Sequence, residues 1–428
     1  MKTFFLSARN YVSLFFLVFI NLGCMYTGKN INQRAQENAN FLNGLDALEK
    51  KEFQDLKGKR IGLITNQTGV NKNLTQNIKL FANSDNVQLK AIYTPEHGLY
   101  GSIPAGEKIS SSKNKIFDVP IYSLYGVTKK PTPEMLRDID LIIYDIQDIG
   151  IRSYTYISTM GLAMEAAAEN NIEFMVLDRP NPLGLKKIEG NILKKDFSSF
   201  IGKYPIPYVY GLSCGELARF INESGWLGPQ KCKLTVIKME NNHRHQVPKI
   251  LDKNWVPTSP HVPSPNTPAY MVATGILGEL GVFSIGVGYT LPFKTIAAPW
   301  IDSELITTEL NALGLKGVRF RPIQYSPYYG KYEGQRVKGV EIFISDKNLV
   351  KLITIQFYFL EVHNKLYPQK NPFEIATKEQ LKMFDKALGT DTIRKAFSGS
   401  FKASDVLSTL VPDLKDYRAK VKDYYIYD

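Results

Sequence analysis

Cysteine is scarce in this sequence, and glycine-rich cofactor motifs are absent. Of the 428 residues only three are cysteine, at positions 24, 214 and 232, and no C-x-x-C pair occurs. This spacing excludes the common cysteine-based zinc and redox motifs. The chain also lacks G-x-G-x-x-G and G-x-x-x-x-G-K-[ST], in which glycines let backbone amides approach a phosphate. We therefore expect no cofactor and no metal, while the sequence leaves open whether Cys214 and Cys232 pair.

Nucleic-acid motifs are also missing, although the formal net charge is +12. A basic chain can bind nucleic acid, an anionic membrane or an acidic polymer. Here the lysines are dispersed, and no zinc-finger, RNP or basic-helix pattern is present. We expect no nucleic-acid partner, and we interpret most of the charge as solvated surface.

A long apolar run occurs only near the N-terminus. Residues 1–24 contain two basic residues, then an apolar run ending at Ile20, then Gly23 and Cys24. This order is typical of an export signal, and the run covers about half of the roughly 20 residues that a membrane span needs. The Gly-Cys pair resembles a bacterial lipoprotein cleavage site. We expect a cell-envelope protein lipidated at Cys24 and attached to the membrane by that lipid; plain secretion is the alternative.

The first half of the remaining chain alternates apolar strands with helices. Polar residues 25–44 predict a tether, and the alternation follows it. Fully apolar strands separated by helices indicate a parallel sheet covered on both faces. We therefore predict a Rossmann-like, doubly wound α/β domain over residues 45–258. Its strands are expected at 60–65, 88–93, 119–126, 140–145 and 173–178.

A proline-rich segment separates this pattern from a second one. Five prolines lie between Trp255 and Tyr270, which predicts an extended connector. Strand patterns at 318–327 and 339–345 follow, and then a helix pattern at 349–364. We predict a second, smaller α+β domain over residues 259–428.

A cluster of polar side chains follows each of the four clearest strands. In open parallel sheets, ligands bind beyond the carboxyl ends of the strands, so these clusters are expected to share one edge. Carboxylate pairs at such an edge suit glycoside cleavage, in which one acid protonates the leaving oxygen and the other acts as nucleophile or base. The clusters are Asn66, Gln67 and Thr68; Glu96 and His97; Asp145, Asp148 and Arg152; and Asp178, Arg179 and Asn181.

Within this edge we predict Glu96 as the catalytic acid, because it ends an apolar strand where partial burial raises the pKa of a carboxyl group. Asp145 or Asp148 is the candidate for the second carboxylate, and His97 would modulate its neighbour. Arginines at the edge are candidates for binding a sugar carboxylate, and nearby tyrosines offer faces on which a sugar can stack. These candidates are Arg152, Arg179, Tyr154, Tyr156, Tyr208 and Tyr210.

The segment GLSCG, at 211–215, fits the G-x-S-x-G pattern of serine hydrolases. Ser213 and Glu216 also have the S-x-x-E spacing of a capping box, in which both side chains satisfy free amides at a helix start. We favour the capping box and keep a serine esterase using Ser213 as a weaker alternative.

Several motifs occur in an order that resembles the bacterial exo-β-N-acetylmuramidase family. They are GLITNQTGV, PEHGLYG, DIQDIGIRSYTYISTM, DRPNPLG, EGN, YPIPYVYGLSCGELA, PSPNTP and GVGYTLPF, and they extend from about Leu45 to the C-terminus. The resemblance implies a Rossmann-like domain, a smaller C-terminal domain and an active cleft between them. It also implies removal of terminal N-acetylmuramic acid from the non-reducing ends of peptidoglycan fragments.

Position by position, the resemblance places Glu96, His97, Asp145 and Asp148 in the catalytic set. Gln147 belongs to the same motif as the two aspartates. The positions expected to bind the substrate are Asn66, Gln67, Arg152, Tyr154, Asp178, Arg179, Asn181, Glu189, Asn191, Tyr210 and Asn266.

Two positions depart from the family pattern. Many members carry Arg-His where this chain has Val209 and Tyr210, and Glu-Gly-Arg-Gly where it has Ile285 to Gly288. An arginine would suit the lactyl carboxylate of muramic acid. The sequence therefore predicts a divergent member that acts on muramic acid or a related amino sugar; a non-catalytic protein that binds peptidoglycan fragments is the alternative.

Overall fold

The computed structural model describes residues 40–104, 106–107, 112–114 and 118–428. The expected signal peptide and the expected lipidation site Cys24 lie outside the described residues. The end of the expected tether is packed, since Phe41 is buried and Leu42 pairs with Glu240. No helix in the described ranges is long and apolar enough to cross a membrane.

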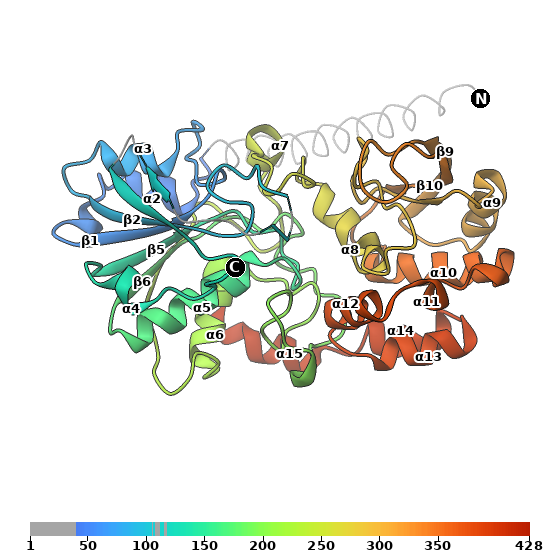
Figure 1. Cartoon of the computed structure of the whole chain (residues 1–428). Helices are drawn as coiled ribbons and strands as arrows, with labels where there is room; N and C mark the ends of the chain where they lie inside the picture. Colours follow the sequence, from blue (N-terminus) through green and yellow to red (C-terminus); the bar gives the residue numbers. More distant parts are fainter. Residues whose placement is uncertain (1–39, 105, 108–111, 115–117) are drawn as a thin grey trace, which may run out of the picture.

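A seven-stranded sheet forms the N-terminal half (Figure 1). Its spatial order is β3-β4-β2-β1-β5-β6-β7; all neighbours are parallel except β3 and β4. Because the chain builds outward from β1 in one direction and then in the other, the sheet is doubly wound, as predicted. The strands are β1 (Arg60–Thr65), β2 (Gln88–Thr94), β3 (Ser112–Asn114), β4 (Val119–Ser123), β5 (Leu141–Asp145), β6 (Glu173–Leu177) and β7 (Lys233–Ile237).

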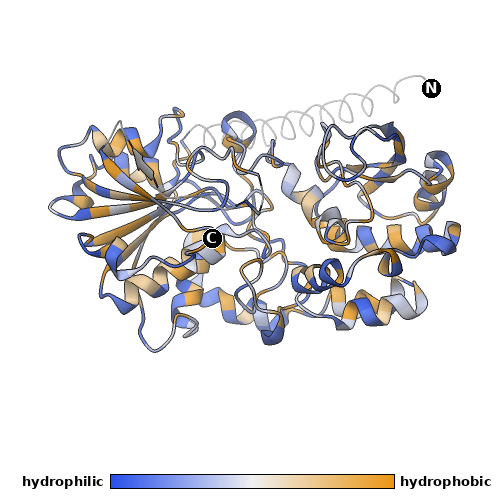
Figure 2. Ribbon diagram, in the orientation of Figure 1, coloured by the Kyte–Doolittle hydropathy of each residue, from blue (hydrophilic) through white to orange (hydrophobic). Residues whose placement is uncertain are grey.

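Helices cover both faces of this sheet. Successive side chains of a strand point to opposite faces, so the apolar residues of one strand pack against helices on both sides. Leu63 of β1 packs toward α2 and α3, whereas Ile64 packs into the core that contains α5 and α6. The central strands are apolar along most of their length, as the orange colour in Figure 2 shows. The helices of this half are α2 (Gly44–Glu49), α3 (Asn77–Ala82), α4 (Pro133–Leu136), α5 (Tyr156–Glu169), α6 (Cys214–Glu223) and α7 (Ile250–Asn254), with 3₁₀ turns η1 (Gln54–Leu56) and η2 (Lys195–Phe197).

The C-terminal half combines a small antiparallel sheet with helices. Strand β10 (Val337–Ile344) lies between β8 (Thr295–Ala298) and β9 (Val318–Tyr325). This arrangement confirms the predicted α+β composition. The helices are α8 (Thr267–Gly278), α9 (Ser303–Ala312), α10 (Ile355–Leu366), α11 (Pro372–Ile375), α12 (Lys378–Leu388), α13 (Thr392–Ser400), α14 (Ser404–Leu410) and α15 (Lys415–Val421), with 3₁₀ turns η3 (Leu352–Thr354), η4 (Pro368–Lys370) and η5 (Lys422–Tyr424).

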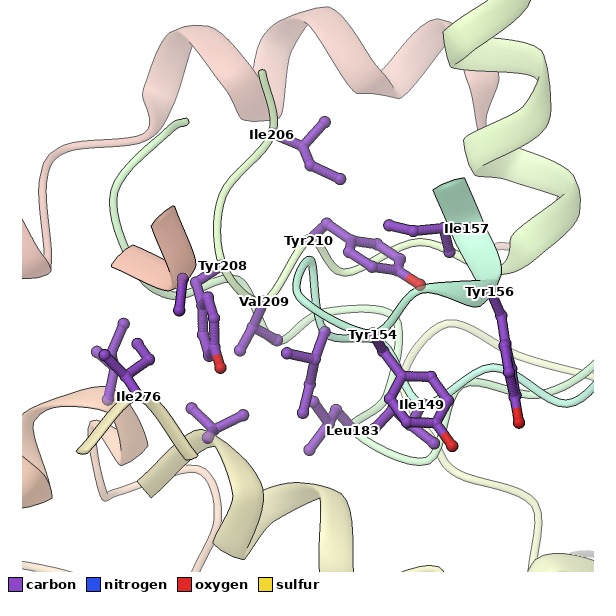
Figure 3. Packing of buried hydrophobic residues seen from close by; sticks show 14 of the residues in the cluster. Ile149, Tyr154, Tyr156, Ile157, Leu183, Ile206, Tyr208, Val209, Tyr210 and Ile276 are labelled. Carbon is purple, nitrogen blue, oxygen red and sulfur yellow. The ribbon is translucent and has the colours of Figure 1, made fainter. Parts of the chain in front are cut away.

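One hydrophobic core continues through both halves. It contains Ile157 of α5 together with Ile276 of α8 and Phe357 of α10. Figure 3 shows part of this core, where Tyr208 and Ile276 belong to the same buried cluster. The chain end also returns to the first half, because the Tyr427 hydroxyl donates to Asp178. The two halves are therefore packed together around shared side chains.

Candidate active site

The predicted polar clusters lie at the carboxyl edge of the parallel sheet. The last residues of two neighbouring strands, Thr65 and Asp145, are paired in register. These strands, β1 and β5, flank the point where the order of the sheet reverses, which is where ligands bind in open α/β sheets. The edge thus has the topology of a binding site, and its side chains divide into distinct groups.

Glu96 lies in the turn after β2, and its side chain is held by hydrogen-bond donors. The Thr155 hydroxyl donates to Oε2 at 2.7 Å, and the Gly106 backbone N–H donates to Oε1 at 3.1 Å. The Tyr125 hydroxyl is a third partner, and burial together with the Glu96 charge raises the pKa of Tyr125 to about 12. With only 7% of its surface exposed, Glu96 is fixed in one orientation by groups from three segments of the chain.

His97 follows in a left-handed conformation, with a φ of +71°. Such a backbone is uncommon for a residue other than glycine and asparagine-like side chains, and it marks a turn under strong local constraint. The Nδ1 atom lies 2.7 Å from the Ile103 carbonyl oxygen. Because a carbonyl only accepts, Nδ1 carries the proton in this contact.

Asp145 is fully buried and ion-paired. Its Oδ1 accepts from Arg179 Nε at 2.6 Å, and its Oδ2 accepts from the Asn77 amide at 2.7 Å. Arg179 also donates to the Val70 carbonyl. Since both carboxylate oxygens and the guanidinium are engaged within the protein, these contacts favour a structural role for Asp145 and Arg179.

Asp148 is buried beside Tyr210. Its Oδ2 accepts from the Gly150 backbone N–H at 2.7 Å and from the Tyr210 hydroxyl. Its Oδ1 has no hydrogen-bond partner among the described residues. Burial raises the pKa of Asp148 to about 6, a value at which a carboxyl group exchanges protons near neutral pH. Asp148 is therefore better suited to proton transfer than Asp145.

Asp178 is surrounded by donors that do not carry charge. The hydroxyls of Ser213 and Tyr427 each donate to Oδ2 at 2.6 Å, and the Gly215 N–H donates to Oδ1. Burial raises the pKa of Asp178 to about 6. Ser213 also accepts from the Glu216 N–H, and both halves of the capping box are present, which confirms that prediction. The Ser213 hydroxyl is thus occupied at a helix start.

Arg152 joins the two halves. Its guanidinium donates to the carbonyls of Asn191 and Ile206 and, across the interface, to those of Ala387 and Leu388 at the end of α12. The Asn191 amide reaches the Leu388 carbonyl as well. Two further predicted residues contact the C-terminal half: Glu189 accepts from the Ile353 N–H, and Asn266 accepts from Lys347. Glu189 also forms an ion pair with Lys187. These contacts favour positioning roles.

The other predicted binding residues are mostly engaged in turns and packing. Asn66 and Asn181 accept backbone N–H groups two residues ahead, and Gln67 donates to the Pro257 carbonyl. Gln147 donates to the Pro180 carbonyl. The four candidate tyrosines, at 154, 156, 208 and 210, are buried, so stacking on a sugar is favoured for none of them except Tyr208, which lines a pocket.

That pocket lies between the two halves and has a volume of about 400 Å³. Ligand sites for small molecules typically measure roughly 300–1,000 Å³. Ser153 and Tyr208 line it from the first half, and His261 lines it from the connector. Burial lowers the pKa of His261, and the charge of His97 lowers it further, so the two histidines are close enough to interact electrostatically. The remaining lining residues are Met271, Gly275, Gly278, Glu279, Gly281, Phe283, Ser284, Ile285, Val287, Phe293, Lys331 and Ala387.

Sequence reasoning missed several of these residues. Thr155 and Tyr125 hold Glu96. Thr155 lies within the DIQDIGIRSYTYISTM motif but was not among the predicted site residues, Tyr125 occurs in a segment without a recognisable motif, and His261 lies in the proline-rich connector. Glu279 did leave a signal, because it is the single charged residue between Met271 and Phe293. An isolated acid in an apolar segment is either buried with a partner or placed for function.

Among the residues that the structure describes, no group of three or more His, Cys, Asp or Glu side chains could hold a metal ion. Cys214 and Cys232 are both free and buried, which answers the question of their pairing.

The chain is similar to proteins of one family along nearly its whole length. The model "Exo-beta-N-acetylmuramidase NamZ, N-terminal" matches residues 61–266, and the corresponding C-terminal model matches residues 269–427. A Bacillus subtilis protein named peptidoglycan beta-N-acetylmuramidase NamZ is 38% identical over 384 residues, which cover 90% of this chain and 91% of that protein.

Two solved structures of Bacteroides fragilis proteins of the DUF1343 family share the fold. One has a TM-score of 0.86 at 45% identity, and the other has a TM-score of 0.70 at 26% identity. Each match covers 91% of this chain and 99% of the other. The paired family models, the similar enzyme and the shared fold agree, and the chain belongs to the exo-β-N-acetylmuramidase NamZ family.

Proposed function

We propose that this protein is a glycoside hydrolase that removes N-acetylmuramic acid from the non-reducing ends of peptidoglycan fragments. The observation that carries the proposal is the match to both family domains, from residue 61 to residue 427. The pocket between the halves supports it, because its volume of about 400 Å³ suits one sugar unit rather than a long glycan segment. Such a pocket fits an enzyme that acts on chain ends.

In this proposal Glu96 is a catalytic carboxyl group and Asp148 is the second. Glu96 is held in one orientation by three donors, and a fixed carboxyl group beside the scissile bond is what glycoside cleavage requires. Asp148 is preferred to Asp145 because it has no cationic partner and a pKa raised to about 6 by burial. His97 is assigned a positioning role next to Glu96.

The test is release of the leaving group from a chromogenic β-N-acetylmuramide. We expect Glu96→Gln to lower kcat by at least about 100-fold, the usual contribution of a general acid or base. Glu107→Gln is the matched control, since Glu107 is exposed in the same loop and should retain wild-type activity. Cleavage by Glu96→Gln at the wild-type rate would refute the assignment.

The same assay addresses the non-catalytic alternative. An active wild-type protein excludes a pure binding role. Tight calorimetric binding of N-acetylmuramic acid without any turnover over many hours would replace the proposed hydrolase with a binding protein.

We also propose that the protein is exported and attached to the membrane of the cell envelope through a lipid on Cys24. The support is the basic, apolar and small-residue order of positions 1–24. Expressed in a bacterium fed an alkyne fatty acid, the wild-type protein is expected to take up the label and to sediment with membranes. Cys24→Ser should lose both properties, whereas Cys214→Ser should keep them; labelling of Cys24→Ser would disprove the anchor.

A further inference from the structure

Glu279 lies at the end of α8 and lines the pocket between the two halves. It is mostly buried, and burial raises the pKa of its carboxyl group. Burial raises the pKa of Tyr208, and the Glu279 charge adds to this effect. Tyr208 lines the same pocket from the first half, so both residues border the space that the two halves enclose.

Among the described residues, no hydrogen bond or ion pair engages the Glu279 carboxylate. Other buried acids of the chain have an ion-pair or hydrogen-bond partner: Asp145 pairs with Arg179, Glu216 pairs with Arg244, and Asp178 accepts from two hydroxyl groups. An acidic side chain is seldom buried without such a partner, because losing water without compensation is costly. A titratable group that is buried and unpaired in a pocket is a candidate for binding a ligand.

The surroundings of Glu279 have the composition of a sugar site. Met271, Gly275 and Gly278 precede it on the same face of α8, at helical spacing. A Cβ atom at Gly278 would lie 2.5 Å from Cδ1 of Ile285, so the small residue lets the end of this side chain pack closely against the helix. The pocket combines apolar walls with polar groups such as Glu279, His261 and Lys331, and this mixture suits a pyranose, which has C–H faces and peripheral donor and acceptor groups.

We propose that the Glu279 carboxylate binds the sugar in this pocket by accepting a hydrogen bond from one of its hydroxyl groups or from its acetamido N–H. This inference rests on the proposed function, since it names a residue that holds the substrate of that reaction. The bound sugar then supplies the partner that Glu279 lacks in the empty protein. In the protein without ligand, the buried carboxylate has no partner, and this lowers the free energy of unfolding.

The test combines three measurements on Glu279→Leu, Glu279→Gln and the control Glu333→Gln, whose glutamate is exposed outside the pocket. We expect Glu279→Leu to raise the Kd for N-acetylmuramic acid and the KM for the chromogenic muramide by about 10-fold or more, as for a lost hydrogen bond to a charged group. Its Tm is expected to rise, because an unpaired buried charge is removed. Glu279→Gln keeps an amide oxygen and should lose less affinity, and the control should match wild type.

The outcomes separate this inference from the proposed function. Unchanged Kd and KM in Glu279→Leu would overturn the inference while wild-type activity still supports the hydrolase. A lower Tm would assign Glu279 a structural role and would also overturn it. An inactive wild type that binds the sugar less tightly after Glu279→Leu would refute the hydrolase and keep the binding role.

Discussion

The pKa of a buried carboxyl group depends on whether a cation or only neutral hydrogen-bond donors lie beside it. Asp145 has the guanidinium of Arg179, so its negative charge is neutralised inside the protein. Asp148 and Asp178 have only neutral donors, and burial raises the pKa of each to about 6. Aspartates at one edge of a sheet therefore differ in their partners, and Asp148 and Asp178, which lack a cationic partner, have raised pKa values near neutral pH.

This difference predicts how stability depends on pH. The pKa of Asp148 is 3.8 in the unfolded chain and about 6 in the fold, so the folded state holds the extra proton between these values. The free energy of unfolding must then fall as the pH rises from 4 to 6. In Asp148→Asn this contribution is absent, and the variant should gain about 3 kcal/mol relative to wild type between pH 4 and pH 7.

Urea denaturation across this pH range measures the relative gain. Asp85→Asn is the control, because Asp85 is exposed and its replacement should leave the pH profile of wild type unchanged. A constant difference between Asp148→Asn and wild type at all pH values would show that Asp148 does not bind the extra proton.

The sequence identified the acids of the site but not their roles. Glu96, Asp145, Asp148 and Asp178 all follow apolar strands, and this pattern is visible without a structure. Their roles differ because of contacts with residues far away in the sequence: Arg179 is 34 residues from Asp145, and Tyr427 is 249 residues from Asp178. Glu279 was missed for the same reason, because its pocket exists only after the halves are packed.

At the scale of elements, helix α6 shows how a local motif can resemble a catalytic one. Ser213 starts this helix, accepts from the Glu216 N–H and donates to Asp178. A serine nucleophile needs a neighbouring base that removes its proton, and Asp178 instead holds the hydroxyl in a buried cap. Here the serine of the G-x-S-x-G pattern is the N-cap residue of a helix.

Ser213→Ala is therefore expected to destabilise the protein by about 1 kcal/mol through loss of the cap. Hydrolysis of the chromogenic muramide should remain at the wild-type rate. Ser213→Thr is the matched control, since threonine also caps helices and should recover most of the lost Tm. If Ser213→Ala lost hydrolysis completely while its Tm stayed unchanged, the serine esterase would have to be reconsidered.

Elements with a strong pattern were predictable, and weakly patterned ones were not. Strand β1 was predicted at residues 60–65 and lies at Arg60–Thr65, because it is apolar on both faces. Strand β7 was missed, since it is an edge strand and its residues are only partly buried. The helices α11, α14 and α15 have seven residues or fewer, so tertiary contacts rather than periodicity determine them.

At the scale of the whole molecule, hydrogen bonds between the two halves hold them together, since each half supplies donors or acceptors to the other. Arg152 donates to carbonyls at the end of α12, and Ile353 of η3 donates to Glu189. These buried hydrogen bonds therefore fix the relative position of the two halves that enclose the pocket. A rigid frame of this kind keeps the Glu96 turn and Glu279 at fixed positions.

The return of the chain end to Asp178 has a consequence for biosynthesis. A ribosome that has added Asp178 must add 249 more residues before the Tyr427 hydroxyl can reach Asp178. Until Tyr427 has been added, Asp178 lacks the hydrogen bond from this hydroxyl group. The contacts of a residue at the end of an early strand are thus completed by a residue that is translated much later.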